Sequence, residues 1–261
     1  MSDTPVLPQA GLAPRGGAFS RRARRVLLVL AGPFYFLAIA FAPVLCRHRA
    51  GFRGWYWRSV KRACSRLLWL LGIRAEMSEA DKARLAGDTD SLIVINHRSH
   101  LDGFCLMHVV PDEKWFTFAA KKEFFSSRLL RTGFTAAGLV PIDRSNGKLA
   151  LKTLVDAVKS MPARRSVVLF PEGTRSEADV LGPFRAGAVL AARETGRRIL
   201  PIVIHDSDAL LPRGRFSPKP GTIHLEVLPA IDCDPGASVD DDVARLHGAM
   251  RAALLAGRGG A

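Results

Sequence analysis

The hydrophobic pattern of the chain changes twice along its length. Residues 26–46 form an uncharged apolar run that matches the ~20 residues a helix needs to cross a membrane. From Trp55 to Leu71, apolar residues recur every three or four positions and basic residues occupy the other side, which predicts an amphipathic helix. From about Met77 onward, short runs rich in β-branched residues alternate with helical patterns.

The alternating part of the sequence predicts an α/β domain. Strands are expected over residues 91–96, 115–121, 139–142, 166–170, 199–204 and 222–228. Helices are expected over residues 148–161 and 187–195, and from near Ser238 to Gly257. Strands that alternate with helices favour a central, mostly parallel sheet flanked by helices. An N-terminal membrane-associated helical segment is expected to precede this domain.

The N-terminal region is expected to anchor the chain in a membrane. Residues 21–25 are mostly arginine and precede the apolar run, and residues 47–49 follow it without the small-residue cleavage site of a signal peptide. Basic residues on both sides leave open whether the run spans the membrane or re-enters it. The amphipathic helix suits an anionic lipid surface; the alternative is an apolar stripe that packs on the protein core.

The predicted organisation has three parts, a flexible basic tail over residues 1–25, membrane-anchoring helices over residues 26–72 and the α/β domain over residues 77–261. The formal charge of +14 indicates an anionic partner, which is a nucleic acid, an anionic membrane surface or a phosphorylated substrate. No reading helix or aromatic platform accompanies the basic residues, which argues against nucleic acid. Four scattered cysteines form no Cys-x-x-Cys pair, which is typical of reduced thiols in a cytosolic compartment.

Polar groups follow three of the predicted strands. NHRSHLDG (96–103) ends the first strand, Asp143 and Arg144 follow another, and PEGTRS (171–176) follows a third. Reactive groups of such sheets usually lie in loops at the strand ends. His97 and Asp102 resemble the base and orienting carboxylate of a catalytic triad, with a substrate hydroxyl in place of the serine. A metal site that includes His100 is the alternative, and it needs a further ligand.

Four segments in this order and at these separations resemble the blocks of the glycerolipid acyltransferase family, whose best-known members are lysophosphatidic acid acyltransferases. They are NHRSHLDG (96–103), GLVPIDR (138–144), FPEGTRS (170–176) and LPIVI (200–204). The resemblance covers roughly residues 90 to 205. This chain has His100 and Pro141 at two positions where the family often has an aromatic residue.

The resemblance implies roles for individual residues. His97 would be the general base that deprotonates the acceptor hydroxyl, and Asp102 would orient it. The other residues that it implicates bind the acceptor: Arg144 and Arg175 would hold its phosphate, and Glu172, Gly173 and Thr174 would shape its site. Planar guanidinium groups suit a phosphomonoester, which agrees with this assignment.

The implied reaction moves a fatty acyl group from an acyl-CoA or acyl carrier protein thioester to 1-acyl-glycerol-3-phosphate and gives phosphatidic acid. The resemblance implies no metal and no cofactor beyond the thioester co-substrate. Another lysolipid, such as a lyso-ornithine lipid or a lysophospholipid, or glycerol 3-phosphate, remains an alternative acceptor, and a non-enzymatic basic membrane-binding protein is an alternative function. The expected location is the inner (cytoplasmic) membrane, with the catalytic domain facing the cytoplasm.

Overall fold

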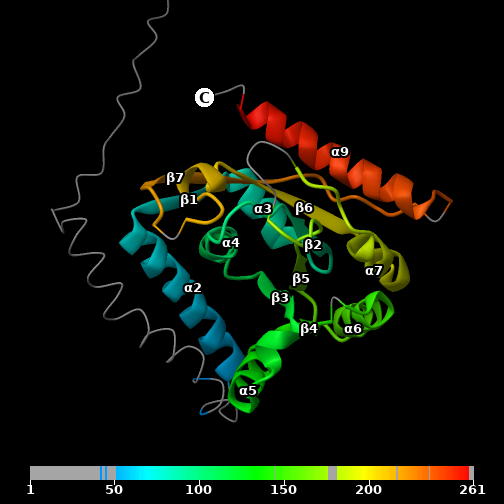
Figure 1. Cartoon of the computed structure of the whole chain (residues 1–261), viewed down its shortest axis with the longest axis horizontal. Coiled ribbons are helices and arrows are strands. Elements are labelled where there is room, and N and C mark those ends of the chain that lie inside the picture. Colours follow the sequence, from blue (N-terminus) through cyan, green and yellow to red (C-terminus); the bar gives the residue numbers. More distant parts are fainter. Residues whose placement is uncertain are drawn as a thin grey trace, which may run out of the picture.

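A computed structural model describes residues 51–143, 145–175, 181–215, 217–234 and 236–258, together with residues 42 and 45. In this part the chain forms a seven-stranded sheet in the order β1-β7-β6-β2-β5-β3-β4 (Figure 1). The strands are β1 (Ile73–Met77), β2 (Leu92–Ile95), β3 (Trp115–Lys121), β4 (Val140–Ile142), β5 (Arg165–Leu169), β6 (Ile199–His205) and β7 (Gly221–Val227).

The sheet is mostly parallel. β6, β2, β5, β3 and β4 run in one direction, because each pairs in parallel with its neighbour. β7 pairs antiparallel with β6 and parallel with β1, so the last two strands at this edge run the opposite way. The carboxyl ends of the five parallel strands therefore meet at one edge of the sheet, where ligand sites of open α/β sheets lie.

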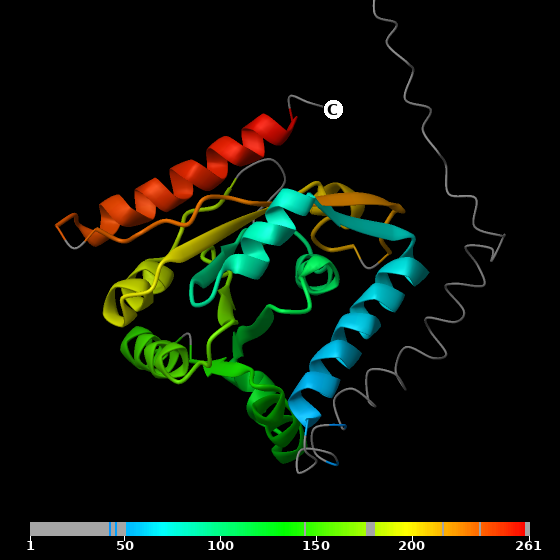
Figure 2. The same ribbon diagram turned by 180° about the vertical axis from the view of Figure 1, so that it is seen from behind.

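Helices cover both faces of the sheet (Figures 1 and 2). They are α2 (Phe52–Leu71), α3 (Glu79–Gly87), α4 (Asp102–Val109), the 3₁₀ helix η1 (Lys122–Phe125), α5 (Arg128–Ala137), α6 (Gly147–Lys159), α7 (Gly187–Thr195), α8 (Ser207–Leu210) and α9 (Val239–Arg258). Side chains of α2, α3 and α4 share one hydrophobic cluster with the sheet, and those of α6, α7 and α9 share a second one.

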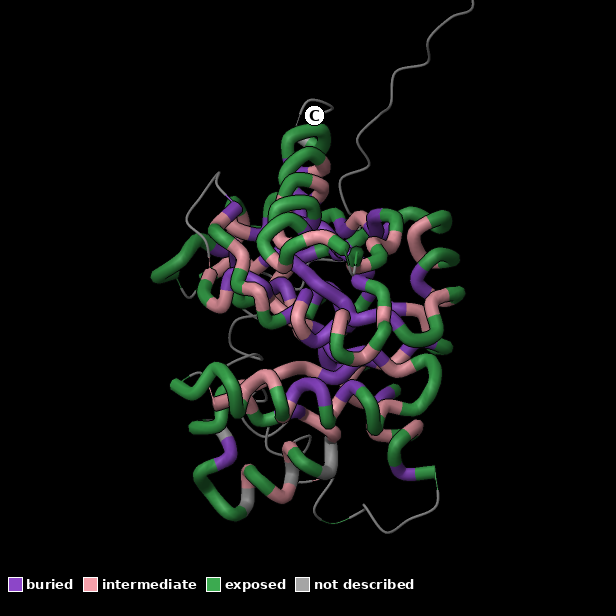
Figure 3. The backbone as a smooth tube through the Cα atoms, turned by 90° about the vertical axis from the view of Figure 1, so that its right-hand side faces the viewer, coloured by how far each residue is buried: buried purple, intermediate pink, exposed green. Residues whose placement is uncertain are grey.

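The most deeply buried strands lie in the middle of the sheet. Every residue of β2 and of β6 is buried, and these strands are continuous apolar runs rather than alternating ones. Such a pattern is expected when helices cover both faces of a parallel sheet. Figure 3 shows this buried backbone through the middle of the molecule with the exposed segments outside it.

The structure confirms the predicted α/β class with its mostly parallel sheet, and each of the six predicted strands is present within a residue or two of its expected bounds. The sequence pattern missed β1, which pairs with β7 through Ile73 to Met77. Buried and exposed residues alternate in this strand, but it has only five residues, and the two exposed ones are the charged Arg74 and Glu76. The pattern was therefore too short and too polar to be recognised as a strand. The sheet consequently begins before residue 77, where the α/β domain was expected to start.

The predicted amphipathic helix is α2, and its apolar stripe packs inside the domain. Trp57, Cys64 and Leu68 are buried in the cluster that also contains residues of α4 and β1. Gly72 ends the helix with φ of 73°, and β1 follows directly at the sheet edge, so the helix is held against the sheet. The expectation that this stripe lies on lipid is therefore wrong, and the alternative of core packing holds.

The remaining predictions about the N-terminal region fall mostly outside the described residues. The tail over residues 1–25 lies there entirely, as does nearly all of the apolar run over residues 26–46. Among the residues that the structure describes, no helix is both long enough and apolar enough to cross a membrane.

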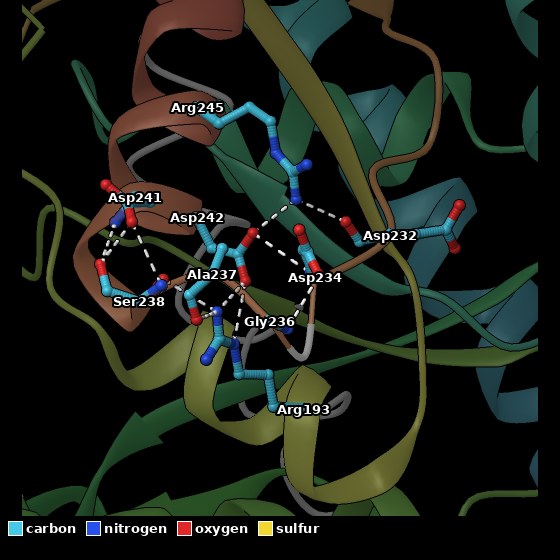
Figure 4. Close-up of polar contacts among 9 residues, drawn as sticks. All are labelled: Arg193, Asp232, Asp234, Gly236, Ala237, Ser238, Asp241, Asp242 and Arg245. Atoms are coloured by element: carbon cyan, nitrogen blue, oxygen red, sulfur yellow. Dashed lines mark hydrogen bonds and ion pairs between the residues drawn. The ribbon is translucent and has the colours of Figure 1, made fainter.

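The last helix, α9, is attached to α7 by buried charges (Figure 4). The carboxylate of Asp242 accepts hydrogen bonds from Arg193 on α7, with Nε 2.9 Å from Oδ2, and from Arg245 one turn further along α9. Ser238 caps the helix, because its hydroxyl accepts the backbone N–H of Asp241 at 3.1 Å. These contacts close α9 over the second hydrophobic cluster.

Candidate active site

A histidine and an aspartate form a hydrogen-bonded pair at the carboxyl end of β2. His97 follows the strand, Asp102 begins α4, and Nδ1 of the histidine lies 2.9 Å from Oδ2 of the aspartate. Asp102 is fully buried, whereas 24% of the His97 side chain is exposed. Because the carboxylate engages Nδ1, Nε2 is the ring nitrogen that can accept a proton. The structure thus brings together the two residues that the sequence predicted to be catalytic.

The turn between β2 and α4 folds the carboxylate back onto the imidazole. Oδ2 of Asp102 also accepts the backbone N–H groups of Arg98 and Ser99, at 2.8 and 2.9 Å. Three donors around one oxygen fix the orientation of the carboxylate. A separation of five residues, which would divide two side chains on one continuous helix, therefore produces a contact here.

The same turn is tied to the strand next to it. The side-chain amide of Asn96 is fully buried and exchanges two hydrogen bonds with the backbone of Ile204 in β6, at 2.7 and 2.9 Å. Beyond β6, the guanidinium of Arg98 lies 2.8 Å from the carboxylate of Asp208. The residues on both sides of His97 are thus fixed to the β6–α8 segment, which limits movement of His97.

Glu172 supports His97 from the neighbouring strand end. Its Oε1 accepts the backbone N–H of His97 at 2.8 Å, and its Oε2 accepts the backbone N–H of Gly182 at 2.9 Å. The residue is 93% buried, since only 7% of its surface is exposed. Both carboxylate oxygens are therefore engaged by backbone groups. The resemblance implied a residue that shapes the acceptor site, whereas the structure shows a contact to the backbone of His97.

An aromatic ring lies against the imidazole. Phe170 follows β5, and Leu169 of this strand is in register with Val94 of β2. The ring centroid of Phe170 lies 4.2 Å from that of His97. This contact, together with the hydrogen bond to Asp102, restricts the rotation of the imidazole. Phe170 also lines the cavity described below, so the same side chain contacts both His97 and the cavity.

The loop after β5 carries three further residues of the predicted site. Gly173 has φ of 72°, in the region that favours glycine, Thr174 is exposed and Arg175 is half-buried. His100 is exposed, but partial loss of surrounding water lowers its pKa, and the positive charge of Arg175 lowers it further. Arg175 therefore lies within electrostatic range of the NHRSHLDG turn.

The other predicted phosphate ligand, Arg144, lies outside the described residues. Nearby, the carboxylate of Asp143 is 2.8 Å from the ammonium of Lys122, and this ion pair and the hydroxyl of Ser145 lower the pKa of Asp143 to about 2. The end of β3 and the segment after β4 are therefore joined by charge at the same edge of the sheet.

A cavity of about 440 Å³ opens beside the loop after β5, between α6 and α7. Its interior is apolar, with Leu151 and Leu154 from α6 and Leu169 from β5 among the lining residues. Lys148 and Arg185 add positive charge to the lining. The sequence reasoning missed both cations, because neither belongs to the matched blocks and only the fold brings them to the same cavity.

The metal-site alternative gains no further ligand from the fold. In the part of the chain that the structure describes, no group of three or more His, Cys, Asp and Glu residues is arranged to hold a metal ion. His100, the histidine that would have completed such a site, is exposed beside Arg175.

Comparisons with known proteins agree with this fold. The overall fold is similar to the crystal structure of the 1-acyl-sn-glycerophosphate (LPA) acyltransferase PlsC from Thermotoga maritima, with a TM-score of 0.70 over 90% of this chain and 94% of that one, at 19% identity. Residues 76–205 match the family model described as Acyltransferase, and they contain the histidine–aspartate pair and the loop after β5. The chain belongs to this acyltransferase family.

Two relatives show how far the similarity extends. A 1-acyl-sn-glycerol-3-phosphate acyltransferase of Limnanthes alba is 32% identical over 186 residues, which are 69% of this chain and 63% of that protein. The human 1-acyl-sn-glycerol-3-phosphate acyltransferase beta is 29% identical over 231 residues, which are 84% of this chain and 79% of that protein. The match to the plant relative thus spans less than two thirds of that protein's length.

Proposed function

We propose that this protein transfers a fatty acyl group from a thioester to the free hydroxyl of 1-acyl-glycerol-3-phosphate, which gives phosphatidic acid. The observation that carries the proposal is the His97–Asp102 pair, which is buried on its aspartate side and accessible on its histidine side. The names of the two relatives support this acceptor over other lysolipids.

In the proposed mechanism, Nε2 of His97 takes the proton of the acceptor hydroxyl as its oxygen attacks the thioester carbonyl. The tetrahedral intermediate collapses, the carbon–sulfur bond breaks, and the imidazolium returns the proton to the leaving thiolate. Asp102 stabilises the imidazolium and keeps Nε2 directed at the substrate through its bond to Nδ1. No covalent acyl-enzyme is required, because the hydroxyl attacks the donor directly.

The acceptor phosphate requires cations near the base, and Arg175 meets that requirement by its place in the loop after β5. Arg144 is proposed as its partner from the sequence. The thioester donor is acyl-CoA or an acyl carrier protein, both of which are acidic and suit a chain with a formal charge of +14.

We further propose that the protein works at the cytoplasmic face of the inner membrane. Residues 26–46 would supply the anchor by their apolar length. The exposed arginines of α2, Arg58, Arg62 and Arg66, lie on the side opposite to its packed stripe and would face anionic lipid headgroups.

The test uses membranes that contain the protein, a panel of lysolipids and glycerol 3-phosphate, each offered with acyl-CoA and with acyl carrier protein thioester. We expect 1-acyl-glycerol-3-phosphate to be acylated, and His97→Ala and Asp102→Asn to lower the rate at least about 1,000-fold, since removal of a triad member has effects of this order. The control is His224→Ala, because His224 is an exposed histidine in β7, on the far side of β6 from β2 and His97. Full activity of His97→Ala would contradict the mechanism, and acylation of a different lysolipid alone would contradict the acceptor.

A further inference from the structure

The cavity between α6 and α7 differs from an ordinary core void in its position. It lies at the carboxyl ends of β4 and β5, and Phe170 and Gly173 of the loop beside the base are among its lining residues. Phe170 contacts the imidazole of His97, with the ring centroids 4.2 Å apart, and also lines the cavity. A molecule in this cavity would therefore have one end close to the proposed base.

Arg185 is held beside the loop after β5 by a backbone hydrogen bond, and its side chain lies close to Gly173. The backbone N–H of Arg185 donates to the carbonyl of Pro171 at 2.9 Å. A Cβ atom placed on Gly173 would lie 2.8 Å from Nε of Arg185, closer than such atoms approach. The absence of a side chain at Gly173 therefore makes room for the guanidinium stem of Arg185, in addition to permitting the positive φ.

Lys148 supplies a second positive charge from the first turn of α6. Both side chains are exposed, and in the portion of the chain that the structure describes neither pairs with a carboxylate. Ile142 and Gly147, which flank Asp143 and Arg144 in the chain, also line the cavity. Exposed cations therefore stand directly beside an apolar interior, an arrangement that fits an anionic group attached to an alkyl chain.

We propose that this cavity receives the acyl chain of the acceptor lysolipid and that Arg185 and Lys148 are additional ligands of its phosphate, besides Arg175 and Arg144. The inference rests on the proposed function, and it assigns two residues and a cavity that the sequence blocks do not include. Gly173 acts as a positioning residue, because it leaves the space that Arg185 occupies.

The chemistry of the two substrates favours the acceptor over the thioester donor. In a lysophosphatidic acid, the phosphate, the reacting hydroxyl and the acyl chain share one glycerol, so they lie only a few bonds apart. In acyl-CoA or an acylated carrier protein, a long pantetheine arm separates the phosphates from the acyl chain. Lys148 and Arg185 line the same cavity as several apolar side chains, and Phe170 of that lining contacts His97, which matches the compact arrangement of the acceptor.

The first test removes the two cations in the full-length protein. Arg185→Gln and Lys148→Gln should each raise the KM for 1-acyl-glycerol-3-phosphate about tenfold or more, because a charge-assisted hydrogen bond to phosphate is lost, and should leave kcat and the KM for the donor within about twofold. Arg251→Gln on α9 and Lys159→Gln at the end of α6 are matched controls for the loss of one exposed charge. A raised donor KM with an unchanged acceptor KM, or no change in either, would overturn the assignment.

The second test fills the cavity. Ala150 lines it from α6 and is only partly buried, so Ala150→Phe adds volume without opening the core. We expect kcat/KM to fall about tenfold for long-chain acceptors and much less for short-chain ones, with the preference for donor chain length unchanged. Lys152→Phe, at an exposed position of the same helix, is the control. A shift in donor chain preference instead would assign the cavity to the donor.

A binding measurement separates this inference from the proposed function. Decyl phosphate and decanol, used below their aggregation limits, test the site without turnover. The wild type should bind the phosphate at least about tenfold more tightly than the alcohol, and Arg185→Gln and Lys148→Gln should each lower that preference. If the protein does not acylate lysophosphatidic acid but still shows this difference, the proposed function fails while the anion site stands; equal binding of both compounds overturns the site.

Discussion

A substitution at Glu172 tests how His97 is held in position. The substitution Glu172→Gln keeps the size of the side chain but replaces one acceptor oxygen with an NH₂ group. Both carboxylate oxygens accept backbone N–H groups, from His97 at 2.8 Å and from Gly182 at 2.9 Å. The glutamine can accept only one of them, so the other N–H faces a donor at hydrogen-bond distance in a buried site.

The magnitude follows from the lost contact. A hydrogen bond to a charged group contributes about 1.5–3 kcal/mol, and 1.4 kcal/mol corresponds to about a tenfold change in rate. If the loss displaces His97 from its position in the transition state, kcat should fall about 10- to 100-fold. The KM for the acceptor should change by less than about threefold, because Glu172 contacts the backbone of the base rather than the substrate.

The assay measures initial rates over a range of acceptor and donor concentrations for wild type, Glu172→Gln and a control, Glu194→Gln, in the last turn of α7. Thermal unfolding checks that the variant is folded at the assay temperature. A raised acceptor KM with kcat near that of the wild type would refute the positioning role and would favour the direct acceptor contact that the sequence suggested.

Three further predictions follow from buried polar contacts and from one perturbed histidine. Asn96→Ala should destabilise the fold by about 2–4 kcal/mol, measured by denaturant unfolding, because it leaves the buried N–H and C=O of Ile204 without their side-chain partners. Asp242→Ala should cost about 2–4 kcal/mol in the same assay, because Arg193 loses its carboxylate; a change below about 0.5 kcal/mol would show that α9 is held by apolar packing alone. Partial desolvation and the charge of Arg175 lower the pKa of His100, so protonation favours the unfolded chain, and stability falls as the pH drops below the ordinary histidine value of 6.5. The melting temperature of His100→Gln should therefore fall less between pH 7 and pH 5 than that of the wild type. An equal fall in both proteins would contradict this contribution of His100.

The amphipathic pattern of α2 shows the limit of a periodicity argument. The spacing of Trp57, Cys64 and Leu68 correctly predicted a helix with one apolar face. A helix with such a face is compatible both with lipid and with a protein core, since both remove apolar surface from water. The pairing of β1 with β7 decides between them, because it holds the end of the helix at the sheet edge.

Local sequence by itself determined most of the architecture. The continuous apolar runs of β2 and β6 and the capped helix α9 are visible because burial on both faces and helix capping each leave a pattern within a few neighbouring residues. The pairing of His97 with Asp102 was also predictable, since both residues lie in one turn.

Only the tertiary structure decided which distant groups share the site. Glu172 lies far from His97 in the chain and reaches its backbone because β5 is the neighbour of β2. Arg185 and Lys148 meet at one cavity because α6 and α7 pack side by side on the same face of the sheet. These contacts depend on strand order and helix packing, which no short stretch of sequence encodes, so a residue's chemical type was visible in the sequence while its partner was not.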